Sequence, residues 1–362
     1  MTKVLFDHQI FSLQRFGGIS RYFANVHHTL KRNNEASSIS TLYSPNHYIQ
    51  DDPGIFGEKL GKLLLPTQQK IYKWNKKYSK YIIRKNNFNV FHPTYYEPYF
   101  LKYLKKPFVL TVHDMIHEKF PHYFAPDDVL AAHKRICIEK AAHIIAISQS
   151  TKDDIQQYLN IPGERISVIH HGFQPFAIEK NEIVNIPQKY LLFVGERGLY
   201  KNFSGFIESV APLLKKDATL NIVCAGGGIF LPEEKDFLAQ HNISGQVSQE
   251  SVTDAKLLSL YQQAIAFVFP SLYEGFGLPL LEAFNYNCPV ITSNTSCFEE
   301  VCGEAAIYFD PYSINSMRNQ IEKAINNQVL RNALRLKGKE RLNHFSIEKS
   351  IEQTINIYRK FG

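Results

Sequence analysis

The residues best suited to chemistry lie between positions 270 and 289, where Glu274 and Glu282 stand eight positions apart. They follow the run 264–269, which is short, apolar, β-branched and aromatic, as is typical of a buried strand in a parallel sheet. Carboxylates beyond the carboxyl end of such a strand are acceptors for the hydroxyl groups of a ribose or a hexose. The structural alternative is a turn glutamate followed by Glu282 in the first turn of a helix, where its charge suits the dipole.

A glycine-containing loop, residues 275–277, separates the two glutamates. Pro279 follows it and suits a helix start, because proline has no N–H to leave unpaired. Glycines let the backbone come close to a ligand, and a helix N-terminus attracts anions. We therefore expect the N–H groups of Phe276, Gly277 and Leu278 to point outward and to hold a phosphate or a sugar hydroxyl.

A second loop carries two cations. Arg197 and Lys201 lie after the strand-like run 190–194 and before a helical stretch. Arginine can hold phosphate oxygens with paired donors while lysine acts as a point charge, so the two together predict an anionic ligand such as a diphosphate. Ordinary surface cations are the alternative, although the helix dipole disfavours positive charge near a helix start.

The first half of the chain offers a glycine turn and a His-Asp pair at comparable places. Gly17 and Gly18 follow the first strand and precede a helix, but a Gly-Gly turn alone is weak evidence of a site. His113 and Asp114 follow the run 108–112; the histidine can hydrogen-bond a hydroxyl in either direction, and the aspartate can accept a proton. A tight turn, a core histidine and a simple cap are the structural alternatives.

Metal and disulfide chemistry is not indicated. The chain has no Asp-x-Asp pair to hold a divalent ion on a diphosphate, no HExxH and no CxxC, so we expect no cofactor and no metal. The five cysteines are odd in number and are typical of reduced thiols in a cytosolic protein. The start of the chain has no signal-peptide pattern and no later segment is long and apolar enough to span a membrane, which favours a cytoplasmic location.

The elements that must position these residues alternate between strand and helix, which predicts an α/β protein with parallel sheets. An irregular stretch at 173–187 divides the alternation into two domains, 1–175 and 176–344, and the tail 345–362 has isoleucines spaced for an amphipathic helix. The expected strands are 4–6, 39–43, 90–91, 108–112, 143–147 and 166–169, then 190–194, 220–225, 246–247, 264–269, 290–292 and 306–309.

The positive charge is concentrated in the first domain. The whole chain has a net charge of +7, yet its first 175 residues hold 23 Lys and Arg against 14 Asp and Glu. Residues 59–85, beginning with Lys59 and ending with Lys85, contain nine basic residues, no acid, one tryptophan and several tyrosines. This composition suits an anionic membrane surface. A single-stranded nucleic acid and a simple solvated helix face are the alternatives.

Taken together, Gly17-Gly18, His113-Asp114, Arg197/Lys201 and the E-x7-E pattern of Glu274 and Glu282 resemble the retaining family-4 glycosyltransferases of the GT-B fold. The resemblance covers essentially the whole chain and is most specific at 270–282. It implies two Rossmann-like domains with parallel sheets facing across a cleft, the donor held mainly by the C-terminal domain, and a final helix, 345–362, that crosses back to the N-terminal domain.

The resemblance also implies roles for the residues. Glu282 would bind the ribose, Glu274 the transferred sugar, and Arg197 and Lys201 the departing diphosphate. His113, with Asp114 beside it, would touch the donor sugar. The remaining donor contacts would come from Gly17, Gly18 and the backbone of Phe276, Gly277 and Leu278.

The expected reaction is transfer of a hexose from a nucleotide-diphosphate sugar to a glycan or lipid-linked acceptor in surface-polysaccharide synthesis. A likeness to bacterial mannosyltransferases around His113-Asp114 and Gly17-Gly18 favours GDP-mannose, while UDP- and dTDP-sugars stay open. No nucleic acid is expected, and the stretch from Lys59 to Lys85 is expected to contact the inner membrane face. A nucleotide-sugar epimerase and a non-catalytic sugar-nucleotide-binding subunit are the alternatives.

Overall fold

The computed structural model describes residues 2–174 and 186–362, so most of the irregular stretch 173–187, including the expected boundary at 175, lies outside the described residues. The chain forms two compact units, each described separately: unit 1 comprises 1–172 and 347–362, and unit 2 comprises 173–346. Every strand pair in both units is parallel.

Unit 1 contains two three-stranded sheets in the orders β2-β1-β3 and β4-β5-β6, which a bridge between Phe91 and Phe108 connects. Apolar strand residues such as Leu5, Leu110 and Ile144 form its core with the helices around them. Its strands are β1 (Val4–Phe6), β2 (Ser37–Ile39), β3 (Val90–His92), β4 (Val109–Val112), β5 (His143–Ala146) and β6 (Ile166–Val168). Its helices are α1 (Gln9–Leu13), α2 (Gly18–Arg32), α3 (Glu58–Leu64), α4 (Gln68–Lys85), α5 (Ile116–Lys119), α6 (Leu130–Lys140), α7 (Gln149–Leu159) and α15 (Ile347–Arg359).

The second strand of unit 1 differs from the expectation of 39–43. Ser40 N–H still donates to the Phe6 carbonyl at 2.9 Å, but beyond it the side chain of Asn75 replaces the neighbouring strand. Asn75 Oδ1 accepts from the N–H groups of Leu42 at 2.8 Å and Tyr43 at 3.3 Å. The strand therefore ends early because a buried amide from α4 satisfies the backbone instead.

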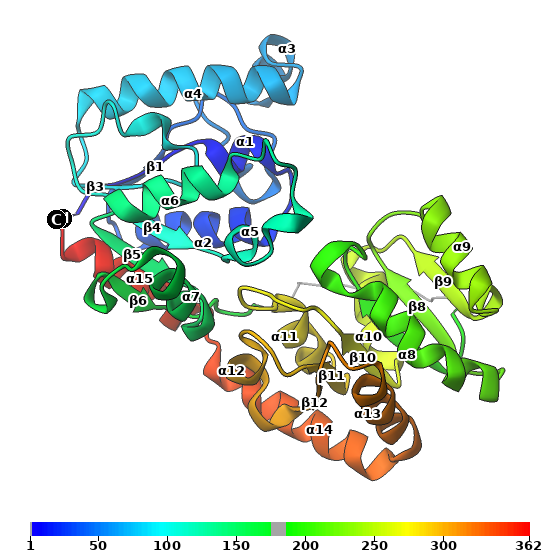
Figure 1. Ribbon diagram of the computed structural model, residues 1–362. Coiled ribbons are helices and arrows are strands. Elements are labelled where there is room, and N and C mark those ends of the chain that lie inside the picture. Colours follow the sequence, from blue (N-terminus) through cyan, green and yellow to red (C-terminus); the bar gives the residue numbers. More distant parts are fainter. Residues whose placement is uncertain (1, 175–185) are drawn as a thin grey trace. The chain divides into compact units, whose positions relative to one another are not determined.

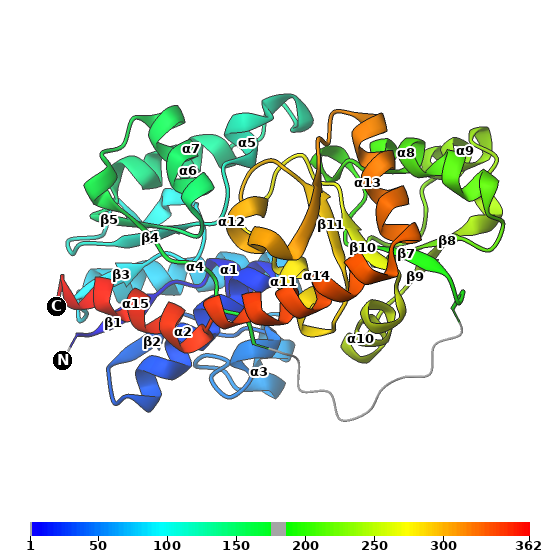
Figure 2. The same cartoon turned by 90° about the horizontal axis from the view of Figure 1, so that it is seen from below.

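The C-terminal helix α15 belongs to unit 1. Its isoleucines Ile351, Ile355 and Ile357 are buried, and it lies beside α2 (Figure 2). The buried Tyr358 hydroxyl lies 2.6 Å from His92 Nδ1 at the end of β3. The last element of the chain thus completes the core of the first unit.

Unit 2 is a six-stranded sheet in the order β9-β8-β7-β10-β11-β12, the doubly wound order of a Rossmann fold (Figure 1). Helix α8 packs with α13, and α11 packs with α14. The strands are β7 (Tyr190–Val194), β8 (Asn221–Ala225), β9 (Val247–Glu250), β10 (Ala266–Phe269), β11 (Val290–Ser293) and β12 (Ala306–Phe309). The helices are α8 (Phe203–Lys216), α9 (Pro232–Gln240), α10 (Asp254–Gln263), α11 (Leu278–Asn285), α12 (Phe298–Cys302), α13 (Ile314–Asn326) and α14 (Gln328–Arg341).

The structure bears out the prediction of two Rossmann-like units with parallel sheets. Among the described helices, none combines the length and the apolar character needed to cross a bilayer.

Candidate functional site

The site of unit 2 lies at the carboxyl ends of β7 and β10. These two strands are neighbours although two strands, β8 and β9, separate them in sequence order, so the sheet reverses its winding between them. Ligands of doubly wound sheets bind in the crevice that this reversal opens beyond the strand ends. The loop after β7 carries Arg197 and Lys201, and the loop after β10 carries Glu274.

Lys201 and Glu274 meet at this point. Lys201 Nζ donates to Glu274 Oε1 at 2.6 Å, and Ser271 Oγ donates to the same oxygen at 2.8 Å. The lysine and glutamate side chains are only 20% and 13% exposed. No described residue donates to Glu274 Oε2 in a hydrogen bond. The structure therefore brings together two of the predicted residues and leaves one carboxylate oxygen for a ligand.

The loop that carries Glu274 is fixed by the loop after β11. Ser296 Oγ donates to the Glu274 carbonyl at 2.5 Å, and Thr295 Oγ1 donates to the Leu272 carbonyl at 2.9 Å. Cys297 Sγ, which is buried, donates to the Phe276 carbonyl at 3.2 Å. These bonds hold the backbone on both sides of the carboxylate, so its position is set by the fold rather than by a ligand.

The glycine loop ends at the start of α11. Gly277 has a φ of +90°, and a Cβ at this position would lie 2.9 Å from Leu280 Cδ1, so a side chain here would be strained. Within the described chain, the N–H groups of Gly277 and Leu278 donate to no protein acceptor. Phe276 places its ring in the interior, 5.6 Å from that of Phe345. The start of α11 thus offers two N–H donors beside the loop of Glu274.

Glu282 lies one residue deeper in α11 than the sequence suggested. The helix begins at Leu278, which makes Glu282 its fifth residue instead of a first-turn residue. The helix starts one residue before Pro279 because Gly277 itself takes the left-handed turn that precedes it. The Tyr261 hydroxyl donates to Glu282 Oε2 at 3.3 Å, and burial, with the neighbouring Glu282 charge, raises the pKa of Tyr261 well above its usual value. Tyr261 therefore stays a donor that orients this carboxylate.

Arg197 has other partners than Lys201 and Glu274. It is buried; its Nε donates to Glu234 Oε1 at 2.7 Å, and its Nη2 donates to Glu234 Oε2 at 3.1 Å. It also donates to the carbonyls of Gly226 and Gly228 in the loop after β8. Gly227, at φ +68°, allows this approach, since its Cβ would lie 2.7 Å from Arg197 Nη1. Arg197 is an internal brace in this structure, and its contact with a diphosphate stays a prediction.

His113 follows β4 in unit 1 and is buried. Its Nδ1 and Nε2 have no hydrogen-bond partner among the described residues, and its ring stacks on that of His171 at 5.8 Å. Burial lowers the pKa of His113 to about 4, although the neighbouring Asp114 charge acts to raise it. His113 is therefore neutral near pH 7, with two buried nitrogens that a ligand hydroxyl would satisfy.

Asp114, just before α5, belongs to a charge cluster with the buried Lys134 of α6 and the nearly buried Glu118 of α5. Lys134 Nζ, fully buried, donates to Glu118 Oε2 at 2.9 Å, to Asp114 Oδ1 at 3.4 Å and to the Asp114 carbonyl at 3.0 Å. Burial acts to raise the pKa of Asp114, but the Lys134 charge and the N–H of Ile116 outweigh it, so that the pKa lies below its usual value. Lys134 thus fixes the segment that carries His113 and Asp114.

Gly17 and Gly18 stand at the start of α2, with Gly17 as its N-terminal cap. The short helix α1 intervenes between β1 and this turn, so the glycines do not follow the first strand directly. The Gln14 side chain packs against Gly17, where a Cβ would lie 2.3 Å from its Oε1.

Several residues at these strand ends were not apparent as site residues from the sequence. The Gly226–Gly228 run directly follows a predicted strand and Ser271 lies two residues after another, so their position was a usable signal. Lys134 gave no signal, because a lysine between His133 and Arg135 in a charged helix is typical of a solvent-exposed position. Among the described residues, no group of three or more His, Cys, Asp or Glu is placed to hold a metal ion.

Comparison with known proteins assigns the chain to a family. Residues 16–175 match the family described as Glycosyltransferase Family 4, and residues 176–341 match the family described as Glycosyl transferases group 1. The chain belongs to these family-4, group-1 glycosyltransferases, which confirms the enzyme class expected from the sequence.

Individual relatives are more distant. The chain is 28% identical over 289 residues to O-antigen chain mannosyltransferase B of Escherichia coli, covering 75% of this chain and 74% of that protein. It is 29% identical over 216 residues to the O-antigen chain mannosyltransferase RfbU of Salmonella typhimurium, covering 59% of each chain. Among solved structures, the sucrose-phosphate synthase of Thermosynechococcus elongatus matches with a TM-score of 0.73 at 16% identity, over 99% of both chains. The last match shows the shared fold.

Proposed function

We propose that the protein is a retaining hexosyltransferase that moves a sugar, mannose by preference, from a nucleotide-diphosphate sugar to a glycan or lipid-linked acceptor in cell-surface polysaccharide synthesis. The observation that carries this proposal is the contact of Lys201 with Glu274 beyond β7 and β10. The bond that breaks joins the sugar to the diphosphate. The Lys201 cation suits the leaving diphosphate, which is anionic, and the Glu274 carboxylate suits the transferred sugar, which carries hydroxyl groups.

In this scheme Lys201 stabilises the departing diphosphate. An ammonium group has three donors, and Glu274 engages one of them, so the others are available to phosphate oxygens. The N–H groups of Gly277 and Leu278 add donors at the start of α11. Fixed donors aimed at charge that develops in the transition state are a large source of catalysis. No general base is assigned.

Two carboxylates bind the uncharged parts of the donor by accepting hydrogen bonds from its hydroxyl groups. Glu274 Oε1 is engaged by Lys201 and Ser271, and Oε2 accepts the hydroxyl of the transferred sugar. Glu282, oriented by Tyr261, accepts the ribose hydroxyls. In unit 1, the neutral, buried His113 is assigned to the donor sugar and Lys134 to the support of Asp114.

Arg197 could act in either of two ways, as a brace for the loop after β8 or as a phosphate ligand. The variant Glu234→Gln distinguishes between them. If Arg197 braces the loop after β8, Glu234→Gln removes the charge that holds it and weakens nucleotide binding. If Arg197 is itself a phosphate ligand, Glu234 competes with the phosphate, and the same variant tightens nucleotide binding. Isothermal titration of the best nucleotide diphosphate against both proteins gives the direction.

The choice of mannose rests on the two curated relatives, both named as O-antigen mannosyltransferases. GDP-mannose is therefore the first donor to test, and UDP- and dTDP-sugars are the comparators. A ligand that binds only the folded state raises the melting temperature, so a panel of GDP, UDP, dTDP and ADP with their sugars identifies the base. No shift with any of them would contradict the proposed function.

Turnover then separates the remaining alternatives. A transferase releases nucleoside diphosphate and extends an acceptor, whereas an epimerase converts the donor without an acceptor, and a binding subunit does neither. The matched control is Glu274→Gln, which keeps the size of the side chain and its contact with Ser271 but removes its charge. Retention is read from the anomeric configuration of the product by NMR.

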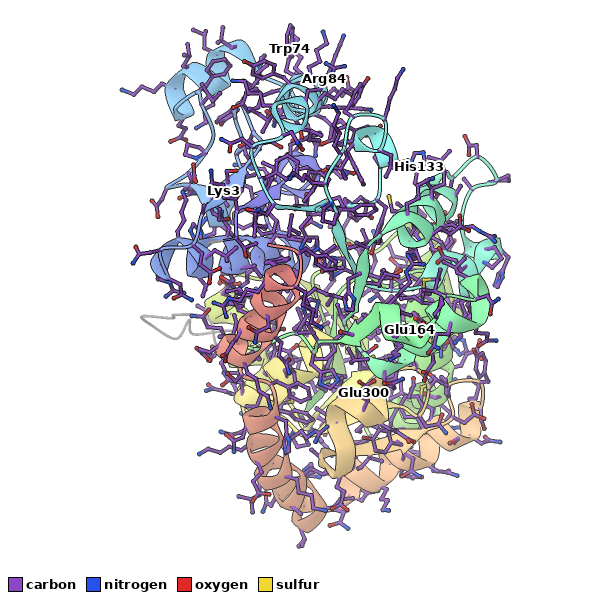
Figure 3. The ribbon with its side chains drawn as sticks, turned by 90° about the vertical axis from the view of Figure 1, so that its left-hand side faces the viewer. Lys3, Trp74, Arg84, His133, Glu164 and Glu300 are labelled. Atoms are coloured by element: carbon purple, nitrogen blue, oxygen red, sulfur yellow. The ribbon has the colours of Figure 1, made fainter. Side chains whose placement is uncertain are left out.

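We also propose that α4 and α3 rest on an anionic membrane at the cytoplasmic face. Helix α4 buries Ile71 and Ile83 inward, and Trp74 and Arg84 project from its other side (Figure 3). Lys77 Nζ lies 4.4 Å from the centre of the Trp74 ring, so the two side chains form a cation–π pair on the exposed side of α4.

The membrane proposal is tested by charge reversal. Lys73 and Lys77 are exposed on α4, and each basic residue near an anionic surface contributes about 1 kcal/mol. We expect Lys73→Glu with Lys77→Glu to abolish sedimentation with phosphatidylglycerol vesicles and to leave nucleotide affinity unchanged. The matched control reverses the exposed Lys216 and Lys235 of unit 2, and equal loss in the control would refute a specific surface.

A further inference from the structure

Unit 1 contains a divided cavity that none of the roles above uses. Two adjoining lobes, each of about 370 Å³, share four lining residues: Arg15, Tyr43, Pro45 and Lys62. The walls come from the segment after α1, the segment after β2, α3 and the start of α4. All of these elements belong to unit 1, so the cavity does not depend on the placement of unit 2.

The cavity has two cations at its mouth. Arg15 makes no ion pair with any described residue, whereas Lys62 pairs with Glu58 at 2.5 Å on the exposed side of α3. Arg15 and Lys62 each line both lobes, so the two cations lie at the same opening. Two neighbouring cations with one exposed glutamate leave a net positive opening.

The interior combines an apolar floor with one amide oxygen that has no hydrogen-bond partner among the described residues. Tyr43, Leu65 and Ile71 form a small buried cluster beneath the opening. Gln14 Oε1 is buried without a hydrogen-bond partner among the described residues, and its amide packs against Gly17. The cavity therefore offers cations for an anion and an amide oxygen for a hydroxyl, and the Gln14 side chain that lines it also contacts Gly17.

The walls are built into the fold. The Arg15 carbonyl accepts from His47 N–H at 2.9 Å, and the Gln14 carbonyl accepts from Asn46 Nδ2 at 2.7 Å. A Cβ at Gly61 would lie 2.2 Å from Tyr43 Cδ2, so α3 presses its backbone directly onto the tyrosine ring. On the outer side of α3, Leu63 is 76% exposed.

We infer that this cavity binds the phosphate-bearing end of a lipid-linked glycosyl acceptor, with Arg15 and Lys62 holding the phosphate oxygens. The inference rests on the proposed glycosyltransferase function and names the acceptor class. An isolated sugar would use the amide but not the cations, and a free phosphate would use the cations but not the apolar floor. A prenyl-diphosphate group uses both the cations and the apolar floor.

The test is a calorimetric titration with farnesyl diphosphate in detergent-free buffer below its micelle concentration. We expect saturable binding that Arg15→Gln with Lys62→Gln weakens at least tenfold. Lys59→Gln is the matched control, because it removes the same charge from α3 without lining the cavity, and it is expected to change affinity less than twofold. Repeating the titration in Lys201→Gln protein excludes binding of the diphosphate at the proposed donor site.

Two further probes distinguish the sources of phosphate. Inorganic pyrophosphate is expected to bind at least tenfold more weakly than farnesyl diphosphate; equal affinity would overturn the lipid-linked assignment. The variants Lys59→Gln and Lys62→Gln are expected to lose the same amount of affinity for phosphatidylglycerol vesicles, because attraction to a charged surface is a general effect. If farnesyl diphosphate follows that same pattern, the cavity is not the site. The nucleotide melting shifts are read separately, so the inference can fail while the proposed function stands.

Discussion

The buried charge cluster in unit 1 leads to a sharp prediction about Lys134. Lys134→Met keeps the length of the side chain and its apolar stem but removes the only cation that contacts the nearly buried Glu118 among the described residues. Breaking a buried pair by removing one partner costs about 3–5 kcal/mol. Asp114 adds little to this figure, because its side chain is 30% exposed and solvent screens it. For a unit of this size the loss corresponds to a lower melting temperature of roughly 6–20 °C.

The chain supplies its own reporter for this measurement. Its only tryptophan, Trp74, lies on α4 of unit 1, so intrinsic fluorescence follows the unfolding of that unit in urea. The matched control is Arg135→Met, because Arg135, beside Lys134 on α6, pairs with Glu139 at 2.9 Å while both side chains are exposed, at 60% and 48%. We expect the control to cost about 1 kcal/mol or less.

A double variant shows whether uncompensated charge is the cause. Adding Glu118→Gln to Lys134→Met removes the stranded carboxylate and is expected to restore more than half of the lost stability. A loss below about 1 kcal/mol in the single variant, or a double variant as unstable as the sum of two separate losses, would refute the reasoning.

The same cluster gives a pH dependence. The folded pKa of Asp114 lies below its unfolded value, so its contribution is present above the unfolded pKa and is lost as pH falls through the folded pKa. Lys134→Met raises that folded pKa, and unit 1 is therefore expected to unfold at a higher pH during acid titration than the parent protein does.

Three further predictions concern the proposed donor site and His113. Glu274→Gln is expected to lower kcat by at least a hundredfold, because it removes the charge that positions Lys201, with melting temperature as the folding control; a smaller effect would exclude Glu274 from catalysis. Gly277→Ala, which strains the backbone against Leu280, is expected to cost about 1–3 kcal/mol in urea unfolding, and Leu278→Ala serves as its control. Burial lowers the pKa of His113 to about 4, so this residue favours unfolding as pH falls from about 6.5 to 4, and an NMR titration midpoint near 6.5 would contradict its neutral, buried state.

Strand patterns and site motifs could be read from the sequence because local rules governed them. The apolar runs at 190–194 and 264–269 predicted the strands β7 and β10, which the structure shows to be neighbours, and the loops after them carry Lys201 and Glu274 in contact. Residues at the ends of parallel strands share one edge, so their proximity follows once both strands are recognised.

Other features depended on side chains far away in sequence. Arg197 reaches Glu234 only because Gly227 leaves room for its guanidinium, which no local pattern encodes. The early end of β2 depends on Asn75, 33 residues from the Leu42 N–H that it satisfies. Long-range polar contacts of this kind override strand propensity, since every buried backbone group must find a partner somewhere.

The return of α15 to unit 1 has a consequence for biosynthesis. A nascent chain emerges N-terminus first, yet His92 contacts Tyr358, a residue that is made only after the whole of unit 2. Unit 2 lies entirely between the two parts of unit 1, so its whole sequence is available to fold before the first unit can close its core. The first unit to be synthesised is therefore the second to be finished, and a stop codon before position 347 leaves the helix α2 without the partner that covers it.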